Sequence, residues 1–121
     1  MGLHDCLIKL NVRYGSEESL NVCREIASHM INSSLQQSAI LAKDFGSYPK
    51  YKEELIMSSP FFKFNANEET INLVKQYGLR NSQVLTCAPT GSLSTMLGIS
   101  GGIEPIYQIS YTRKTETLND G

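Results

Sequence analysis

The feature that most constrains the fold of this 121-residue chain is one unusually long helical pattern. Ser16 is a favoured N-cap residue, and Glu17 and Glu18 place negative charge in the first turn, where the helix dipole stabilises it. Apolar residues then recur at helical spacing as far as Phe45, and Gly46 supplies a stop. The predicted helix has about 30 residues and is roughly 45 Å long. Such a helix usually spans a larger body than a short chain supplies, so the pattern indicates a piece of a larger structure.

Three shorter helices are expected around the long one. Leu3–Leu10 has apolar residues at helical spacing and begins without a cap, which is typical of a cut made inside a structure. A short helix is also expected at Lys52–Met57, within an otherwise irregular stretch, Ser47–Phe64, that has a turn at its second proline. The last of the three begins at its N-cap residue, Asn67, and ends at Gly78.

The final third of the chain predicts two strands that flank a loop and a short helix. Val84–Ala88 is an apolar run bounded by polar residues and a proline, which favours a buried strand of the parallel type. The loop Pro89–Ser94 and a helical stretch to about Leu97 follow it, and Ile106–Thr112 is the second expected strand. Two strands with a crossover are part of a sheet or barrel and not a whole one.

The predicted fold class is therefore α/β, as a mostly helical piece of a larger sheet or barrel. We expect a single fragment over residues 1–121, mainly helical over 1–79 and strand–loop–helix–strand over 80–121. The composition, 40% hydrophobic and 19% charged, is that of an ordered globular chain. The net charge of −1 gives no argument for a nucleic-acid or membrane partner, and no apolar run approaches the roughly 20 residues of a membrane-spanning helix.

The cysteines and histidines predict no metal centre. Cys6, Cys23 and Cys87 are widely spaced and form no Cys-x-x-Cys pair, so neither a disulfide scaffold nor a zinc site is expected. Each lies in an apolar pattern and is interpreted as a small buried hydrophobic residue. His4 and His29 have no accompanying cysteine or carboxylate cluster and are interpreted as structural or surface residues. A reduced, cytoplasmic protein fits this usage best.

The strongest candidate site is the loop Pro89–Ser94, whose residues suit an anion. Gly91 has no Cβ and lets the backbone approach a ligand closely, while N–H groups at the start of the following helix have no partner within that helix. Thr90, Ser92 and Ser94 add hydroxyl donors, so a phosphate could be held without any lysine. The alternative is a simple capped turn with Thr90 or Ser92 as the N-cap. The lysine of a Walker A loop is absent.

A second candidate feature is the turn Ser100–Pro105. Its paired glycines, Gly101 and Gly102, permit a tight backbone path, and the carboxylate of Glu104 could lie close to the phosphate loop. The alternative is an ordinary surface turn. Arg113 and Lys114 could contact a phosphate, although a solvated strand end is the simpler interpretation.

These segments together resemble the barrel region of ribonucleotide reductase large chains. The resemblance is carried first by Arg80–Ser94, which ends in Ala88-Pro89-Thr90-Gly91-Ser92-Leu93-Ser94, and by the downstream turn that ends in Gly102-Ile103-Glu104-Pro105. Tyr111–Thr115 continues it and is most similar to the adenosylcobalamin-dependent members. At the other end, Gly2-Leu3-His4-Asp5 and Tyr14-Gly15-Ser16 also resemble the family, so the similarity covers nearly the whole chain and is weak only in Ser47–Asn65.

The resemblance implies a part of a ten-stranded α/β barrel in an enzyme that reduces ribonucleotides by radical chemistry. Pro89, Thr90, Gly91, Ser92 and Ser94 would hold the substrate's diphosphate or triphosphate. Gly101, Gly102, Glu104 and Pro105 would shape the neighbouring turn. The family's radical cysteine and reducing cysteine pair precede this region, and none of the three cysteines here matches them. The chain itself would therefore bind no metal or cofactor and be inactive alone. For the parent enzyme, the resemblance around Ser100–Thr115 favours adenosylcobalamin without excluding a metal-dependent partner subunit.

The implied partners are a ribonucleotide substrate and the remainder of the reductase chain, and exposed apolar faces would favour self-association of the piece. Two other functions stay open on the residues alone. One is a stand-alone phosphate- or nucleotide-binding module, and the other is a helical interaction module in which the long helix docks a partner. The sequence does not indicate which radical generator the parent enzyme uses. It also does not indicate whether the substrate is a diphosphate or a triphosphate.

Overall fold

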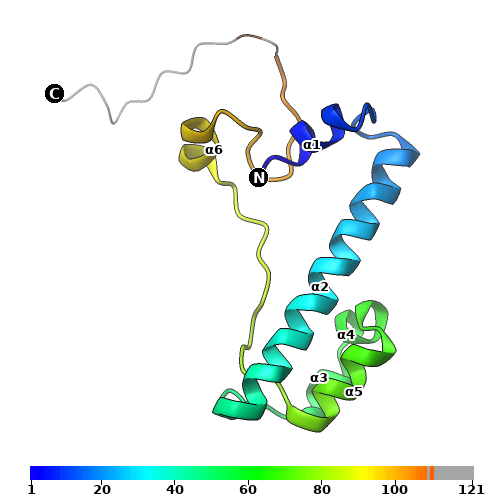
Figure 1. Ribbon diagram of the computed structural model, residues 1–121, viewed down its shortest axis with the longest axis vertical. Helices are drawn as coiled ribbons and strands as arrows, with labels where there is room; N and C mark the ends of the chain where they lie inside the picture. Colours follow the sequence, from blue (N-terminus) through cyan, green and yellow to red (C-terminus); the bar gives the residue numbers. More distant parts are fainter. Residues whose placement is uncertain (109, 111–121) are drawn as a thin grey trace, which may run out of the picture. The chain divides into compact units, whose positions relative to one another are not determined.

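A computed structural model describes residues 1–108 and Ser110 of the chain (Figure 1). These residues contain the helices α1 (Leu3–Lys9), α2 (Glu17–Phe45), α3 (Glu53–Ser58), α4 (Pro60–Asn65), α5 (Glu68–Tyr77) and α6 (Gly91–Leu97). They form two compact units. The helical unit is Gly15–Thr86, and the loop unit combines Met1–Tyr14 with the described residues from Cys87 onward.

The long helix α2 confirms the prediction made from its pattern. The Ser16 side chain caps it by accepting a hydrogen bond from the N–H of Ser19 at 3.2 Å. It ends at Gly46, whose φ of 77° and ψ of 162° lie in a region that is essentially limited to glycine. Local capping chemistry therefore fixes both ends of the longest element in the chain.

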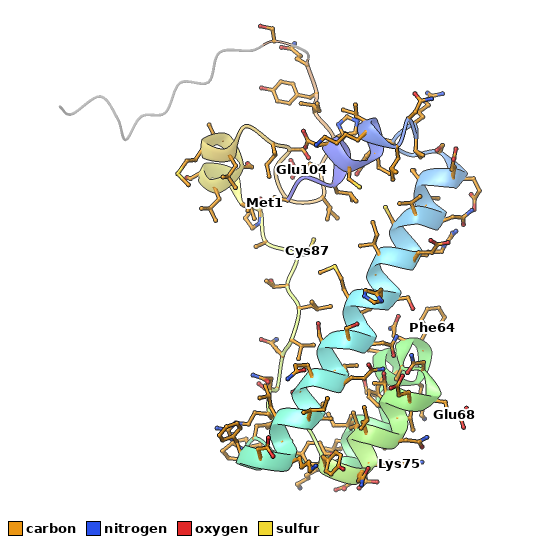
Figure 2. All side chains as sticks on the ribbon, in the orientation of Figure 1. Met1, Phe64, Glu68, Lys75, Cys87 and Glu104 are labelled. Atoms are coloured by element: carbon orange, nitrogen blue, oxygen red, sulfur yellow. The ribbon has the colours of Figure 1, made fainter. Side chains whose placement is uncertain are left out.

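Helix α5 lies alongside α2 in the helical unit (Figure 1). As predicted, Asn67 caps it, with the Oδ1 atom of Asn67 accepting from the N–H of Thr70 at 2.8 Å, and Gly78 ends it. Glu68 lies in its first turn and Lys75 in its last, which suits the helix dipole (Figure 2). The core between the helices consists of Leu35, Ala39, Phe62, Val74 and Leu79.

Asn32 provides a buried polar link between the helices of this unit. Its side chain, 7% exposed, donates to the carbonyl of Asn65 at 3.0 Å and accepts from the N–H of Asn67 at 2.8 Å. It also accepts from the hydroxyl of Thr70 at 2.7 Å. Because a buried polar group is stable only when hydrogen-bonded, this network requires one specific register of α5 against α2.

The stretch between α2 and α5 is more helical than its sequence predicted. The short helix expected at Lys52–Met57 is present as α3, one residue further along. The expectation of irregular structure up to Phe64 was wrong, because α4 begins at Pro60 after the single residue Ser59. Proline is well suited to the first helical position, where its missing N–H has no intrahelical partner, and burial of Phe62 anchors the short helix.

The predicted strand Val84–Ala88 is not formed. This segment is extended and exposed except at Val84, and no strand occurs among the described residues. A strand is defined by hydrogen bonds to a neighbouring strand, and the described residues offer this segment no such neighbour. Of the second predicted strand, Ile106–Thr112, residues 106–108 are not in a strand, and Ile109 and Tyr111 onward lie outside the described residues.

The cysteines are free, as expected, but their predicted burial was wrong for two of them. Cys6 and Cys87 are exposed, and Cys23 is half-buried. Helix α1 buries only Leu7, which leaves its other faces open, and Cys87 lies in the extended segment that lacks a strand partner.

Within the part of the chain that the structure describes, no helix is both long and apolar enough to cross a membrane.

Candidate phosphate-binding loop

The candidate loop leads into helix α6 through a residue in an uncommon conformation. Thr90 precedes the helix with φ 45° and ψ 31°, in the left-handed region that β-branched residues rarely adopt. Its side chain does not cap α6. The Oγ1 atom instead accepts a hydrogen bond from the N–H of Gly102 at 2.7 Å. The simple capped turn with Thr90 as its cap is therefore not what forms, because the hydroxyl is directed to the turn that follows the helix.

The loop hydroxyl groups divide into an inner and an outer set. Ser94 is 5% exposed, and its Oγ atom donates to the carbonyl of Gly91 at 3.1 Å, so it stabilises the first turn of α6. Ser92 is exposed, and Thr90 and Gly91 are half-buried. Thr90 receives one hydrogen bond and keeps its own hydroxyl proton for donation. Of the three loop hydroxyl groups, those of Ser92 and Thr90 are therefore the less buried, and Pro89 is exposed beside them.

The two glycines of the following turn lie in close contact with the loop. A Cβ on Gly102, which has φ 52°, would be 3.3 Å from the carbonyl oxygen of Ala88. A Cβ on Gly101 would be 3.2 Å from Ser94 Oγ and 3.5 Å from the carbonyl oxygen of Pro89. The turn and the loop thus approach backbone to backbone, which explains why this stretch carries glycine at both positions.

Glu104 and Pro105 are both exposed on this turn, and Glu104 is labelled in Figure 2. The N–H of Glu104 donates to the carbonyl of Gly101 at 3.0 Å, which closes the turn. This contact involves the backbone of Glu104 and not its carboxylate. Arg113 and Lys114 lie outside the described residues.

Helix α1 contributes contacts to this turn that the sequence did not reveal. The Asp5 carboxylate accepts the N–H of Ser100 at 2.7 Å, and the N–H of Gly2 donates to the carbonyl of Ser100 at 2.8 Å. The Ser100 hydroxyl is buried beside the same carboxylate but reaches hydrogen-bond geometry with no described residue. Within Ser100, the Asp5 carboxylate is therefore hydrogen-bonded to the backbone N–H and not to the hydroxyl.

Two aromatic side chains hold the far end of the turn. The Nδ1 atom of His4 accepts the N–H of Ile106 at 2.8 Å, and the Tyr14 hydroxyl donates to the carbonyl of Ile103 at 2.8 Å. The two rings pack edge to face with centroids 5.3 Å apart. We call Asp5, His4 and Tyr14 the N-terminal clamp. Only the joint appearance of both segments in the family resemblance could have suggested it, because nothing near residue 5 points to residue 100.

The pKa of Asp5 is lowered from its ordinary value of 3.8. The nearby Ser100 hydroxyl is the largest cause, followed by the Ser100 N–H, and the Asp5 N–H and His4 add to it, while partial desolvation opposes the shift. The clamp therefore holds its carboxylate in the charged, accepting form.

Comparison with known proteins identifies the family of this chain. The model of the ribonucleotide reductase barrel domain matches residues 1–120. A ribonucleoside-diphosphate reductase subunit alpha from Chlamydia trachomatis is 30% identical over 130 residues, covering 89% of this chain and 12% of that protein. A vitamin B12-dependent ribonucleoside-diphosphate reductase from Thermoplasma acidophilum is 32% identical over 113 residues, covering 93% and 13%. The comparison with solved structures found no match.

The match covers the chain far more completely than it covers the relatives. A ribonucleoside-diphosphate reductase subunit alpha from Synechocystis is 33% identical, with 88% of this chain but 15% of that protein aligned. The chain therefore spans about an eighth of the length of the relatives it matches. Since the family model extends over nearly every residue, from α1 through the loop and turn described above, the chain belongs to the ribonucleotide reductase barrel-domain family.

Proposed function

We propose that this chain forms part of the catalytic barrel of a ribonucleotide reductase large subunit and supplies the loop that holds the substrate's phosphate. The observation that carries the proposal is the tie between Thr90 and Gly102, which joins the loop to the turn and leaves Ser92 exposed. The family match supports the reaction, the conversion of ribonucleotides to deoxyribonucleotides. The names of the relatives support a ribonucleoside diphosphate as the substrate.

The chemistry of the loop fits a phosphate. Phosphate oxygens accept hydrogen bonds, and Thr90 and Ser92 retain hydroxyl protons to donate. Ser94 does not face the ligand in this proposal but holds Gly91 in place. The loop contributes positioning, because anchoring the remote phosphate fixes the ribose relative to groups that remove its hydrogen atom.

The relatives named for vitamin B12 support adenosylcobalamin as the cofactor of the parent enzyme. A groove in the helical unit can be compared with the size of that group. One partly enclosed groove in the helical unit has a volume of about 280 Å³ and is lined by Leu35, Phe62, Val84 and their neighbours. That volume lies below the roughly 300–1,000 Å³ of pockets for drug-sized ligands, so it cannot enclose a corrin ring.

Titration of the chain with inorganic phosphate and with a nucleoside diphosphate, followed by NMR, tests the proposal. We expect shifts confined to the amides of Thr90–Ser94 and the adjoining turn. Ser92→Ala removes a hydrogen bond to a charged group, worth about 1.5–3 kcal/mol, and should weaken binding about tenfold or more. Ser33→Ala, at an exposed serine of α2, is the matched control and should leave the affinity unchanged.

A well-dispersed spectrum without ligand-induced shifts at the loop would overturn the phosphate site in this chain. It would instead favour a helical interaction module, for which Ser92→Ala is neutral. Binding by the wild type that Ser92→Ala leaves unaffected would move the site away from this loop.

A further inference from the structure

We propose that Asp5 is a positioning residue for the phosphate loop, acting through Ser100 and Gly102 on Thr90. The inference rests on the proposed function and adds to it a residue outside the loop motif. Asp5 and Ser100 are 95 positions apart in the sequence, yet both belong to the loop unit. No direct contact between Asp5 and the ligand is needed.

The first link fixes Ser100 from two sides. Its N–H donates to Asp5 Oδ2 at 2.7 Å, and its carbonyl accepts the N–H of Gly2 at 2.8 Å. Ser100 is 7% exposed, so water does not readily replace these partners. Both backbone polar groups of Ser100 are thereby bound to the start of α1.

The second link carries this placement to the loop. Gly102 follows Ser100 by two residues, and its N–H donates to Thr90 Oγ1 at 2.7 Å. Gly102 has little room to move relative to the loop, because a Cβ added to it would be only 3.3 Å from the Ala88 carbonyl oxygen. A displacement of Ser100 would therefore reach Thr90 instead of being absorbed between them.

The third link prevents the turn from swinging about Ser100. His4 accepts the N–H of Ile106 and Tyr14 donates to the carbonyl of Ile103, so the turn is held at both ends by Met1–Tyr14. Thr90 benefits most from this support. Its left-handed backbone is unfavourable for a β-branched residue, and a strained conformation persists only where the surroundings fix it.

The test compares Asp5→Ala with Asp5→Asn in the 121-residue chain, using two readouts. Without ligand, hydrogen exchange of the Ser100 and Gly102 amides measures the clamp. With inorganic phosphate, the shifts of Thr90–Ser94 measure affinity. Asp5→Ala should lose protection at both amides. It should also weaken phosphate binding about tenfold, because the ligand must then order a turn that the hydrogen bond to the Asp5 carboxylate no longer holds. Asp5→Asn retains an acceptor oxygen and should restore most of both. Asp44→Ala, at an exposed aspartate of α2, should change neither.

The possible failures are distinguishable. If Asp5→Ala loses amide protection but binds phosphate within twofold of the wild type, Asp5 has a structural role only, and the inference is overturned while the proposed function stands. If the wild type binds no phosphate, the proposed function fails in this chain and the inference fails with it. Unchanged amide shifts at Thr70 and Asn81 in each variant show that the helical unit is still folded.

Discussion

At the scale of single residues, Asp5 makes the loop unit sensitive to acid. Its pKa is lowered in the folded chain, so its contribution to stability is fully present above the ordinary pKa of 3.8 and is lost as pH falls through the lowered value. We expect the Ser100 amide to shift in NMR spectra with a midpoint below 3.8 as the carboxylate takes up a proton. Asp5→Asn should abolish that transition. A midpoint at or above 3.8 would contradict the ionised clamp.

Ser94 shows how one residue type can serve different purposes within a motif. The sequence placed Thr90, Ser92 and Ser94 together as hydroxyl donors for a ligand. The structure directs Ser94 inward, where its hydroxyl donates to the carbonyl of Gly91, and leaves Ser92 exposed. Composition alone could not separate them, because the distinction depends on where the first turn of α6 points.

At the scale of elements, Gly46 and Gly78 offer a matched comparison of helix ends. Both end a helix with φ near 77° and extended ψ, a region that is essentially limited to glycine. A Cβ at Gly46 would meet nothing within 4 Å, whereas at Gly78 it would collide with the Ser47 side chain and come within 3.2 Å of the Tyr51 ring.

We therefore expect Gly46→Ala to lower the free energy of unfolding by roughly 1–3 kcal/mol through backbone strain alone. Gly78→Ala should add about 1–3 kcal/mol more from overpacking. Urea denaturation followed by circular dichroism measures both. Equal losses in the two variants would show that the helical unit absorbs the collision by moving Ser47.

The elements that the sequence predicted well are those whose signals are local. Ser16, Asn67 and the glycines that follow α2 and α5 act within one turn of the chain, and each was confirmed. Helix α4 was missed because its start depends on a proline that is also typical of turns. The strand at Val84–Ala88 was predicted from apolar character, but a strand also needs a neighbour, and residue patterns do not say whether one is present. The clamp joins residues about 100 positions apart and left no local signal.

At the scale of the whole molecule, the chain belongs to an enzyme family, but we do not expect it to be catalytically active alone. The chain spans 12–15% of its relatives, and the resemblance to the family assigns none of its three cysteines to radical or reducing roles. We expect the 121-residue chain, supplied with ribonucleotide, reductant and adenosylcobalamin, to produce no deoxyribonucleotide above background. A full-length relative assayed in parallel is the positive control. Turnover by the chain alone would overturn the assignment of its cysteines.

The loop unit is discontinuous in sequence, and this has a consequence for the order of folding. Its clamp contacts span 89, 95 and 102 residues, whereas the hydrogen bond between Ser38 and Asn81 in the helical unit spans 43. Closing a longer loop costs more chain entropy, and contacts between distant residues form more slowly. During synthesis, the helical unit can fold before Ser100, the partner of Asp5, has been added to the chain. The clamp contacts would then form after the helical unit. A chain interrupted before residue 100 would contain a folded helical unit but no clamp to hold the loop.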